Sequence, residues 1–264
     1  MCHKRSMYID AHAHLDKYDL HLPQVIGEIE EHEIFTVSVS MDAEGYAKSK
    51  AIDGQTEWVI STFGVHPRNA PKLHSQLEAL QPLIDTSPMI GEIGLDYHWV
   101  CEPSNHDLQR DVFRYFVKEG VSQKKILNIH SKGAEADVDR ILGELGVQRA
   151  IIHWYSGPHH ELYALAEKDV YFTVGVEILF SSSIQEIAKL VPSSLLLTES
   201  DNPGGYRWLT GDIGMPSIIT QVVKKLAELR GWSEDETKER ILHNFQQLAG
   251  EDDWAKGIKT PRPE

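Results

Sequence analysis

Short apolar runs rich in β-branched residues alternate along this chain with longer stretches in which apolar residues recur at helical spacing. The short runs predict eight strands, over residues 7–12, 34–40, 58–66, 89–96, 126–130, 150–153, 170–176 and 195–201. The segment between one predicted strand and the next is always long enough for a loop and a helix. The pattern therefore predicts eight consecutive strand and helix units.

Helical spacing is clearest over residues 107–119 and 216–230. Eight such units predict an α/β fold with a single domain, a (β/α)8 TIM-type barrel. A doubly wound open sheet has the same alternation, but here polar residues recur at the carboxyl ends of strands spread over the whole chain, which favours the barrel. We expect the barrel over residues 1–250 and a polar C-terminal tail over 251–264.

Composition and charge limit the range of partners. The formal net charge of −14 argues against a broad, nonspecific grip on nucleic acid, although a local site can still bind phosphate. No stretch approaches the ~18 consecutive apolar residues that a membrane span needs. Cys2 and Cys101 are far apart, which favours a reducing compartment over a disulfide framework. We therefore expect no membrane partner, a cytoplasmic location and a monomer.

His12 and His14 are the first sign of chemistry in the chain. They stand one residue apart at the end of a predicted strand, so both imidazoles point to the same side and can hold one metal ion. Asp10 lies two positions earlier and can orient a ligand from behind. A chance pair of histidines is about as probable on this spacing alone, so the weight comes from the other strands.

Ligand-type side chains recur at the ends of later strands. Besides the first pair, Glu92, His130, His153 and Asp201 end predicted strands four, five, six and eight. The carboxyl ends of barrel strands meet at one mouth, so all six side chains should converge there. Such a set can hold two divalent ions if Glu92 bridges them, and Asp201 can also accept a proton from an activated water. The ligand types admit Zn, Mn, Ni, Fe or Mg.

The ordered motifs resemble those of a known family, the TatD-type metal-dependent hydrolases, which are the DNase branch of the amidohydrolase-like barrels. The resemblance covers nearly the whole chain and rests on DAHAHL over 10–15, GVHP over 64–67, GEIGLDY over 91–97, IHS over 129–131, IHWYSG over 152–157, TESDNP over 198–203 and Asn244 in the last helix. It implies a barrel in which His12, His14, Glu92, His130, His153 and Asp201 hold the metals. It also implies hydrolysis of phosphodiesters, often DNA from the 3′ end.

Three further residues are predicted to contact substrate. His66, in the GVHP segment, is similar to a phosphate contact, although a structural histidine before a turn proline explains it equally well. Lys132 stands where family members usually carry arginine, and lysine binds phosphate only as a point charge. The segment 204–215 offers only Arg207, where many nucleases of the family are rich in basic residues. This departure weakens the case for DNA more than the case for hydrolysis.

Tyr206 and Trp208 lie in that same segment. Both could stack on a base or a sugar, but packing against the rim of the barrel is the favoured interpretation.

Three functions follow from these residues. The leading hypothesis is a two-metal phosphodiesterase whose catalytic groups are Asp201 and Glu92 and which acts as a 3′–5′ deoxyribonuclease on single-stranded DNA. The alternative is an amidohydrolase-type enzyme for a small cyclic amide, lactone or deaminated ring, which needs the same histidines and aspartate. The third, a metal-binding scaffold without activity, is disfavoured because all six ligands are retained, and clustered buried charges without metal would cost stability.

Overall fold

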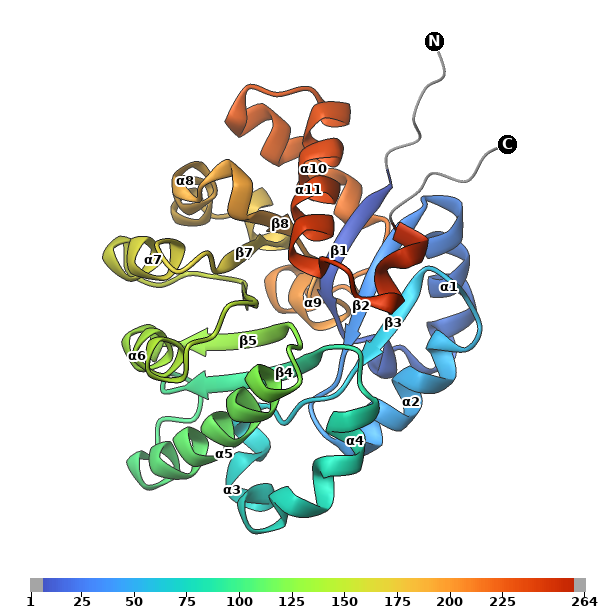
Figure 1. The fold of residues 1–264 in the computed structure, drawn as a ribbon. Coiled ribbons are helices and arrows are strands. Elements are labelled where there is room, and N and C mark those ends of the chain that lie inside the picture. Colours follow the sequence, from blue (N-terminus) through green and yellow to red (C-terminus); the bar gives the residue numbers. More distant parts are fainter. Residues whose placement is uncertain (1–6, 259–264) are drawn as a thin grey trace.

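The structure, a computed structural model, describes residues 7–258. Within that range every predicted strand is present, and the strands line the inside of a barrel with helices around it (Figure 1). The strands are β1 Tyr8–Ala13, β2 Ile34–Val39, β3 Val59–Thr62, β4 Ile90–Asp96, β5 Leu127–Lys132, β6 Ala150–His153, β7 Tyr171–Val174 and β8 Leu196–Thr198. The predicted α/β barrel is confirmed.

The strands run parallel in chain order and form two hydrogen-bonded groups, β1-β2-β3 and β4-β5-β6-β7-β8. Two seams join the groups. At the first, the Gly91 amide donates to the Phe63 carbonyl at 2.9 Å, next to a bridge between Phe63 and Ile90. At the second, the Asp201 amide donates to the His12 carbonyl at 2.9 Å. The second seam places the carboxyl end of β8 directly beside that of β1.

Two glycines permit close backbone approach next to the future site. A Cβ at Gly64 would lie 2.3 Å from the Glu92 carbonyl oxygen, and one at Gly94 would lie 2.0 Å from the His130 carbonyl oxygen. Gly94 also has a φ of 144°, which side-chain-bearing residues rarely adopt. The glycines of the GVHP and GEIGLDY segments therefore set the distances between β3, β4 and β5.

Three predicted strands exceed the observed ones by three residues or more. The prediction over 170–176 exceeds β7 because a 3₁₀ segment begins at Val176. The prediction over 58–66 exceeds β3 because the chain leaves the sheet after the single bridge at Phe63, and the His66 amide donates to the Met41 carbonyl at 3.2 Å. The prediction over 195–201 exceeds β8, since Asp201 has a left-handed φ of 50° that strand pairing does not allow. Apolar runs in the sequence indicate buried residues, and the chain stays buried beyond the last residue that pairs within the sheet.

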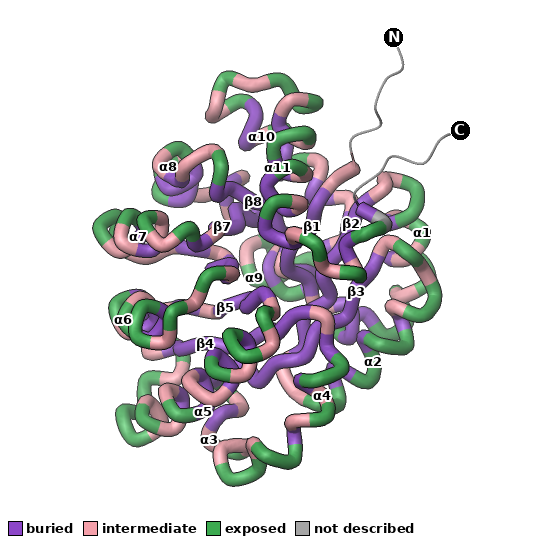
Figure 2. The backbone as a smooth tube through the Cα atoms, viewed as in Figure 1, coloured by how far each residue is buried: buried purple, intermediate pink, exposed green. Residues whose placement is uncertain are grey.

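The α-helices cover the outside of the barrel, with buried faces toward the strands and exposed faces outward (Figure 2). They are α1 Leu22–Glu31, α2 Ala43–Asp53, α3 Ala70–Leu73, α4 Gln81–Thr86, α5 Pro103–Ser122, α6 Glu135–Leu145, α7 His159–Ala166, α8 Ser182–Leu190, α9 Gly204–Thr210, α10 Ile218–Arg230 and α11 Glu234–Ala249. The helices predicted over 107–119 and 216–230 correspond to α5 and α10. Helix α5 extends further at both ends, and at its N-terminal end Pro103 supplies a first-turn residue before the apolar stripe begins.

The short 3₁₀ segments lie at the ends of strands and helices. They are η1 Leu15–Lys17, η2 Asp19–His21, η3 Pro67–Asn69, η4 His74–Leu80, η5 Val176–Leu179, η6 Ser193–Leu195 and η7 Asp253–Ile258. Segments η3 and η5 lie beyond the carboxyl ends of β3 and β7, so they contribute residues to the mouth of the barrel.

The C-terminal segment departs from the expected tail over 251–264. Residues Ala255 and Ile258 in η7 are buried against the core, and Trp254 packs on Phe245 with ring centroids 6.1 Å apart. Arg149 donates to Asp252 at 2.7 Å and fixes the start of this segment to β6. The first part of the predicted tail is thus packed, because a few apolar residues in a polar stretch are enough to dock it. Residues 259–264 lie outside the described range.

No helix between residues 7 and 258 is both long and apolar enough to cross a membrane. Cys101 carries an exposed thiol, whereas Cys2 lies outside the described residues.

Candidate metal centre

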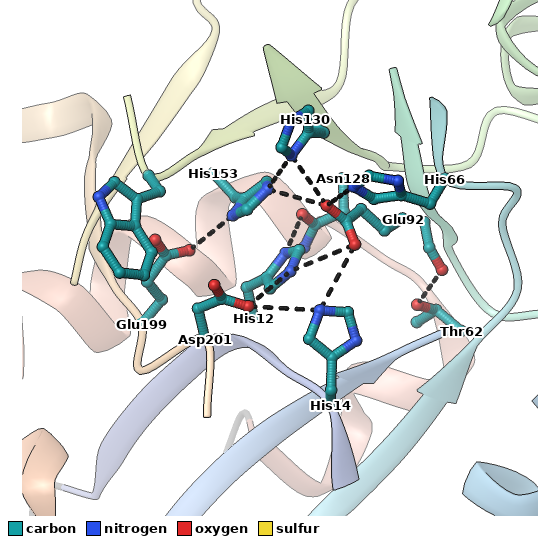
Figure 3. Close-up of polar contacts among 12 residues, drawn as sticks. His12, His14, Thr62, His66, Glu92, Asn128, His130, His153, Glu199 and Asp201 are labelled. Atoms are coloured by element: carbon teal, nitrogen blue, oxygen red, sulfur yellow. Dashed lines mark hydrogen bonds and ion pairs between the residues drawn. The ribbon is translucent and has the colours of Figure 1, made fainter. Parts of the chain in front are cut away.

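The six predicted ligands converge at the carboxyl ends of the strands. His12 and His14 reach the mouth from β1, Glu92 from β4, His130 from β5, His153 from β6 and Asp201 from the end of β8 (Figure 3). They lie at a cavity of about 370 Å³, and His12 is fully buried beneath it. The structure therefore brings together side chains that are up to 189 residues apart along the chain.

Glu92 occupies the centre of this group, between two sets of imidazoles (Figure 3). Its Oε1 lies 3.0 Å from His153 Nε2 and 3.1 Å from His130 Nδ1. Its Oε2 faces the other way and lies 3.4 Å from His14 Nε2 and 3.9 Å from His12 Nε2. One carboxylate thus presents a separate oxygen to each set of imidazoles.

Asp201 completes the set on the side of β1. Its Oδ1 lies 3.3 Å from His14 Nε2 and 3.7 Å from His12 Nε2. His12, His14 and Glu92 place ligand atoms within 4.8 Å of one another, and so do His66, Glu92 and His130. The observed spacing of nitrogen and oxygen atoms therefore offers ligand groups on both sides of Glu92.

Buried polar atoms without hydrogen-bond partners support a metal in this place. Among the described residues, His12 Nε2 and Glu92 Oε2 are fully shielded from solvent and make no hydrogen bond. An unpaired buried polar atom costs free energy, so atoms left free in this way indicate a ligand. Imidazole nitrogens with carboxylate oxygens are the donors that first-row divalent ions prefer. The residues therefore fit divalent metal binding.

Asn128 orients His12 for such a role. It lies in β5 two positions before His130, so both side chains point into the barrel. The Nδ1–H of His12 donates to Asn128 Oδ1 at 2.8 Å, and the Asn128 amide donates to the Ala11 carbonyl at 2.8 Å. A proton held on Nδ1 leaves the lone pair of Nε2 free for a metal.

Removal of Asn128 should weaken metal binding without removing a ligand. We expect Asn128→Ala to lower the affinity for divalent metal about 10- to 100-fold, since partners of this kind fix the ring and its tautomer. Competition with a chelator measures the affinity, and Asn105→Ala on α5 is the matched control. An unchanged affinity in a folded Asn128→Ala protein would contradict this role.

Two acidic residues behind the histidines were not predicted as site residues. Asp96 Oδ2 lies 3.2 Å from His130 Nε2, on the opposite side of that ring from Glu92. Glu199 Oε2 lies 3.6 Å from His153 Nδ1 and accepts the Thr173 hydroxyl at 2.7 Å. A signal for both was present, because Asp96 follows Glu92 by four residues on the same face and Glu199 precedes Asp201 by two.

Asp10 has a different partner from the predicted one. Its carboxylate accepts the Ser200 hydroxyl at 2.6 Å and the Ser200 amide at 2.8 Å, whereas its contact with His12 is a 3.4 Å bond to the backbone amide. Asp10 therefore ties β1 to the end of β8, and the His12 ring is oriented by Asn128 instead.

The electrostatic balance of the cluster favours a cation. Burial lowers the pKa of both His12 and His66 to about 3, so both rings are neutral, and His12 Nε2 can offer its lone pair to a metal. Burial opposes the charge on His14, but Asp201 and Glu92 outweigh it and raise its pKa to about 9. Burial also disfavours the charge on Glu92, yet the surrounding imidazoles hold its pKa well below the usual value. The Glu92 carboxylate thus stays charged and attracts positive charge.

Of the three predicted substrate contacts, two line the cavity and one does not. His66 lines the cavity, and its Nδ1 accepts the Arg68 amide at 3.0 Å. The neutral ring therefore carries its proton on Nε2, 3.5 Å from Glu92 Oε1, where it can donate to a phosphate oxygen. Lys132 lines the cavity and its ammonium group donates to Ser156 at 2.6 Å. Arg207 is exposed on α9 and does not line the cavity. Arg68, which the sequence analysis did not single out, does line it.

The two aromatic residues of α9, Tyr206 and Trp208, also lie in different surroundings. Tyr206 packs against Phe180 with ring centroids 6.2 Å apart, as the packing interpretation expected. Trp208 also packs at the mouth, with its ring centroid 6.2 Å from that of Trp154, but it lines the cavity and stays 62% exposed.

Comparison with known proteins identifies the family of this chain. The profile of the family described as "TatD related DNase" matches residues 9–250, nearly the whole chain. The chain belongs to the TatD-related DNase family. The resemblance seen in the sequence is thereby confirmed, and the enzyme class predicted from it, a metal-dependent hydrolase, is that of this family.

Individual relatives are distant but cover the chain. A Bacillus subtilis protein, "Uncharacterized metal-dependent hydrolase YabD", is 27% identical over 260 residues, which are 92% of this chain and 98% of the relative. A mouse protein, "Putative deoxyribonuclease TATDN3", is 25% identical over 258 residues, 91% of this chain and 87% of the relative. The crystal structure of the TatD homologue YJJV from Escherichia coli covers 91% of this chain and 97% of its own, with 21% identity and a TM-score of 0.84. That structure supports the fold.

Proposed function

We propose that this protein is a two-metal phosphodiesterase that removes nucleotides from the 3′ end of single-stranded DNA. The observation that carries the proposal is the position of Glu92, whose two oxygens face two separate groups of imidazoles. A carboxylate in that position would be able to hold two cations, and paired divalent ions are a recurring device for hydrolysing phosphoesters.

Each ion would have its own ligands. His12, His14 and Asp201 would hold one ion together with Glu92 Oε2, and His130 and His153 would hold the other together with Glu92 Oε1. Asp96 would keep the His130 ring in place from behind. When bound, such ions supply an activated water and neutralise charge on the phosphoryl oxygens.

Residues of the protein would accept the proton and bind the phosphate. Apart from the carboxylate of Glu92, Asp201 Oδ1 is the carboxylate oxygen nearest to His12 and His14. It is therefore placed to accept the proton of the attacking water. His66 and Lys132, which both line the cavity, would donate to the nonbridging phosphate oxygens. Arg68 at the rim would add a second positive charge for the chain entering the cavity.

The substrate class rests on the family and on the shape of the site. A cavity of about 370 Å³ is within the range of ~300–1,000 Å³ typical of small-ligand sites, which suits one strand end better than a duplex. The family description and the name of the mouse relative both refer to deoxyribonucleases. Lys132 and Arg68 supply local positive charge at the mouth despite the net charge of −14.

Digestion of 5′-labelled single-stranded DNA tests the substrate and the polarity together. The parent protein, stripped and reloaded with Mn²⁺, should shorten the labelled strand stepwise from its 3′ end. An Asp201→Asn protein purified identically should not, which excludes a contaminating nuclease. If the parent leaves the strand intact with metal confirmed bound, DNA is not its substrate.

A cyclic amide or lactone is the alternative that such a negative result would favour. Inorganic phosphate separates the two classes, because it should compete with a phosphoester for the cationic wall of Lys132 and Arg68 and should leave hydrolysis of dihydrouracil unaffected.

A further inference from the structure

Three tryptophans stand at the mouth of the barrel, each just beyond a strand that supplies a ligand. Trp99 follows β4, Trp154 follows directly after His153 of β6, and Trp208 lies in α9 beyond Asp201. All three line the same cavity as the candidate metal ligands. Large apolar side chains are costly to expose, yet Trp99 is 58% and Trp208 is 62% exposed. Exposed indoles inside a polar catalytic mouth indicate a ligand with an apolar face.

The rings of Trp99 and Trp208 form a corner. Their centroids are 6.5 Å apart and their planes are inclined by 84°, so the edge of one ring faces the other. A planar group that stacks on one indole would meet the second indole edge-on, and both arrangements are favourable between aromatic rings. We call this pair the indole corner.

The corner is fixed in place by residues of the candidate metal centre. Asp96, whose Oδ2 faces His130, uses its Oδ1 to accept the Trp99 amide at 2.7 Å. On the other side, Trp208 packs on Trp154 with centroids 6.2 Å apart. The Trp154 indole N–H donates to Glu177 at 2.6 Å, which holds this third ring still. The indole corner therefore keeps a set position relative to the ligands.

Gly205 allows the Trp154 ring to reach this position. A Cβ at Gly205 would lie 2.8 Å from Cζ3 of Trp154, so a larger residue at the start of α9 would push the ring away. The edge-to-face contact of Trp154 with Trp208 therefore depends on the absence of a side chain at Gly205.

Other residues of the cavity lining offer charge for the phosphate of a nucleotide. Lys132 and Arg68 carry positive charge and line the cavity together with the candidate ligands, whereas the indole corner is uncharged and flat. A molecule that contacts both the charged residues and the indole corner joins a phosphate to a planar ring, as a nucleotide does. Base stacking on aromatic side chains is strong and tolerates any base.

We propose that Trp99 and Trp208 form a stacking site for the nucleobase attached to the phosphate that is cleaved. This inference rests on the proposed phosphodiesterase function. The site would give the enzyme affinity for strand ends whatever their sequence, and it would compensate for the shortage of basic residues in the segment 204–215.

Two ligands that differ only in the base test the stacking site by binding, without turnover. The first is thymidine 5′-monophosphate and the second is 2-deoxyribose 5-phosphate, each titrated calorimetrically into the Mn²⁺-loaded protein. The parent should bind the nucleotide at least about 10-fold more tightly. Trp99→Leu and Trp208→Leu should each weaken nucleotide binding about 5- to 10-fold and leave binding of the sugar phosphate unchanged.

Two further variants control this result. Trp208→Phe keeps an aromatic face and should retain most of the preference for the nucleotide. Tyr163→Leu removes an aromatic residue that is 47% exposed on α7, away from the cavity lining, and should change neither affinity. Equal binding of both ligands by the parent, or equal loss of both in the tryptophan variants, would overturn the stacking site.

The proposed function fails by a different result. If the parent hydrolyses bis(p-nitrophenyl) phosphate but shows no preference for the base, only the stacking site is wrong. If it hydrolyses no phosphodiester with metal bound, the phosphodiesterase function is wrong.

Discussion

Glu92→Gln should lower hydrolysis of a phosphodiester by about 10³-fold or more, because metal ions supply several kcal/mol of transition-state stabilisation and each 1.36 kcal/mol is about tenfold in rate. The neutral amide keeps the shape of the side chain but removes the negative charge between the two groups of imidazoles. The amide can also present only one oxygen, so it cannot offer an oxygen to both groups. Binding of at least one ion should be lost with the activity.

Metal binding and folding can be separated from activity in this variant. Divalent metal at 1,000 times its dissociation constant stabilises a folded protein by about 4 kcal/mol, so it should raise the melting temperature of the parent and hardly raise that of Glu92→Gln. Glu186→Gln on the exposed face of α8 is the matched control. Glu92→Asp keeps the charge on a shorter side chain and should retain part of the metal response. Parent-like turnover by Glu92→Gln would exclude the bridging role.

Asp201→Asn should reduce kcat about 10²- to 10⁴-fold, the range that a positioned proton acceptor contributes. Three ligand residues remain on that side, His12, His14 and Glu92, so most of the metal should stay bound. The asparagine keeps one oxygen near His14 but cannot accept a proton. The loss should therefore fall on kcat much more than on metal content.

Metal content and steady-state kinetics on the same protein preparation distinguish these two effects. Asp212→Asn, on the exposed turn after α9, is the matched control and should behave as the parent. If Asp201→Asn loses its metal in proportion to its activity, Asp201 acts only as a ligand. If kcat is unchanged, it has neither role.

The strands of the barrel were predictable from the sequence because each is a continuous apolar run between polar segments. β6 was predicted with its observed bounds, Ala150–His153. Predictions failed at strand ends where the backbone turns while staying buried, as it does after Thr62 in β3. The packing of Trp254 and Ile258 was missed because two apolar residues in a polar stretch make no periodic pattern.

The site was predictable as a list of side chains and less so as a network. Alternation along a strand places Asn128 on the same face as His130, but nothing in the sequence says that it meets His12, 116 residues away. That contact depends on the closure of the barrel, which brings β1 opposite β5. The contacts of Asp96 with His130 and of Glu199 with His153 lie within one sheet, and they required the structure because the sequence does not show which strand ends meet.

The mouth of the barrel was the least predictable part. Arg68 and Trp99 lie beyond strand ends, in segments whose direction depends on local turns, and both line the cavity. Arg207, predicted from its position after Asp201, points away because α9 is a helix and its residues face different sides. Trp208, one residue later, faces the cavity. Strand periodicity carries no information about such segments.

The most direct test of the whole account is the hydrolysis of bis(p-nitrophenyl) phosphate by one protein preparation before and after chelation and after reloading with Mn²⁺. The account predicts turnover that disappears on chelation, returns with metal, and is absent from Glu92→Gln at every metal concentration. Turnover that survives chelation, or that is equal in Glu92→Gln, would contradict a metal-dependent phosphodiesterase centred on Glu92.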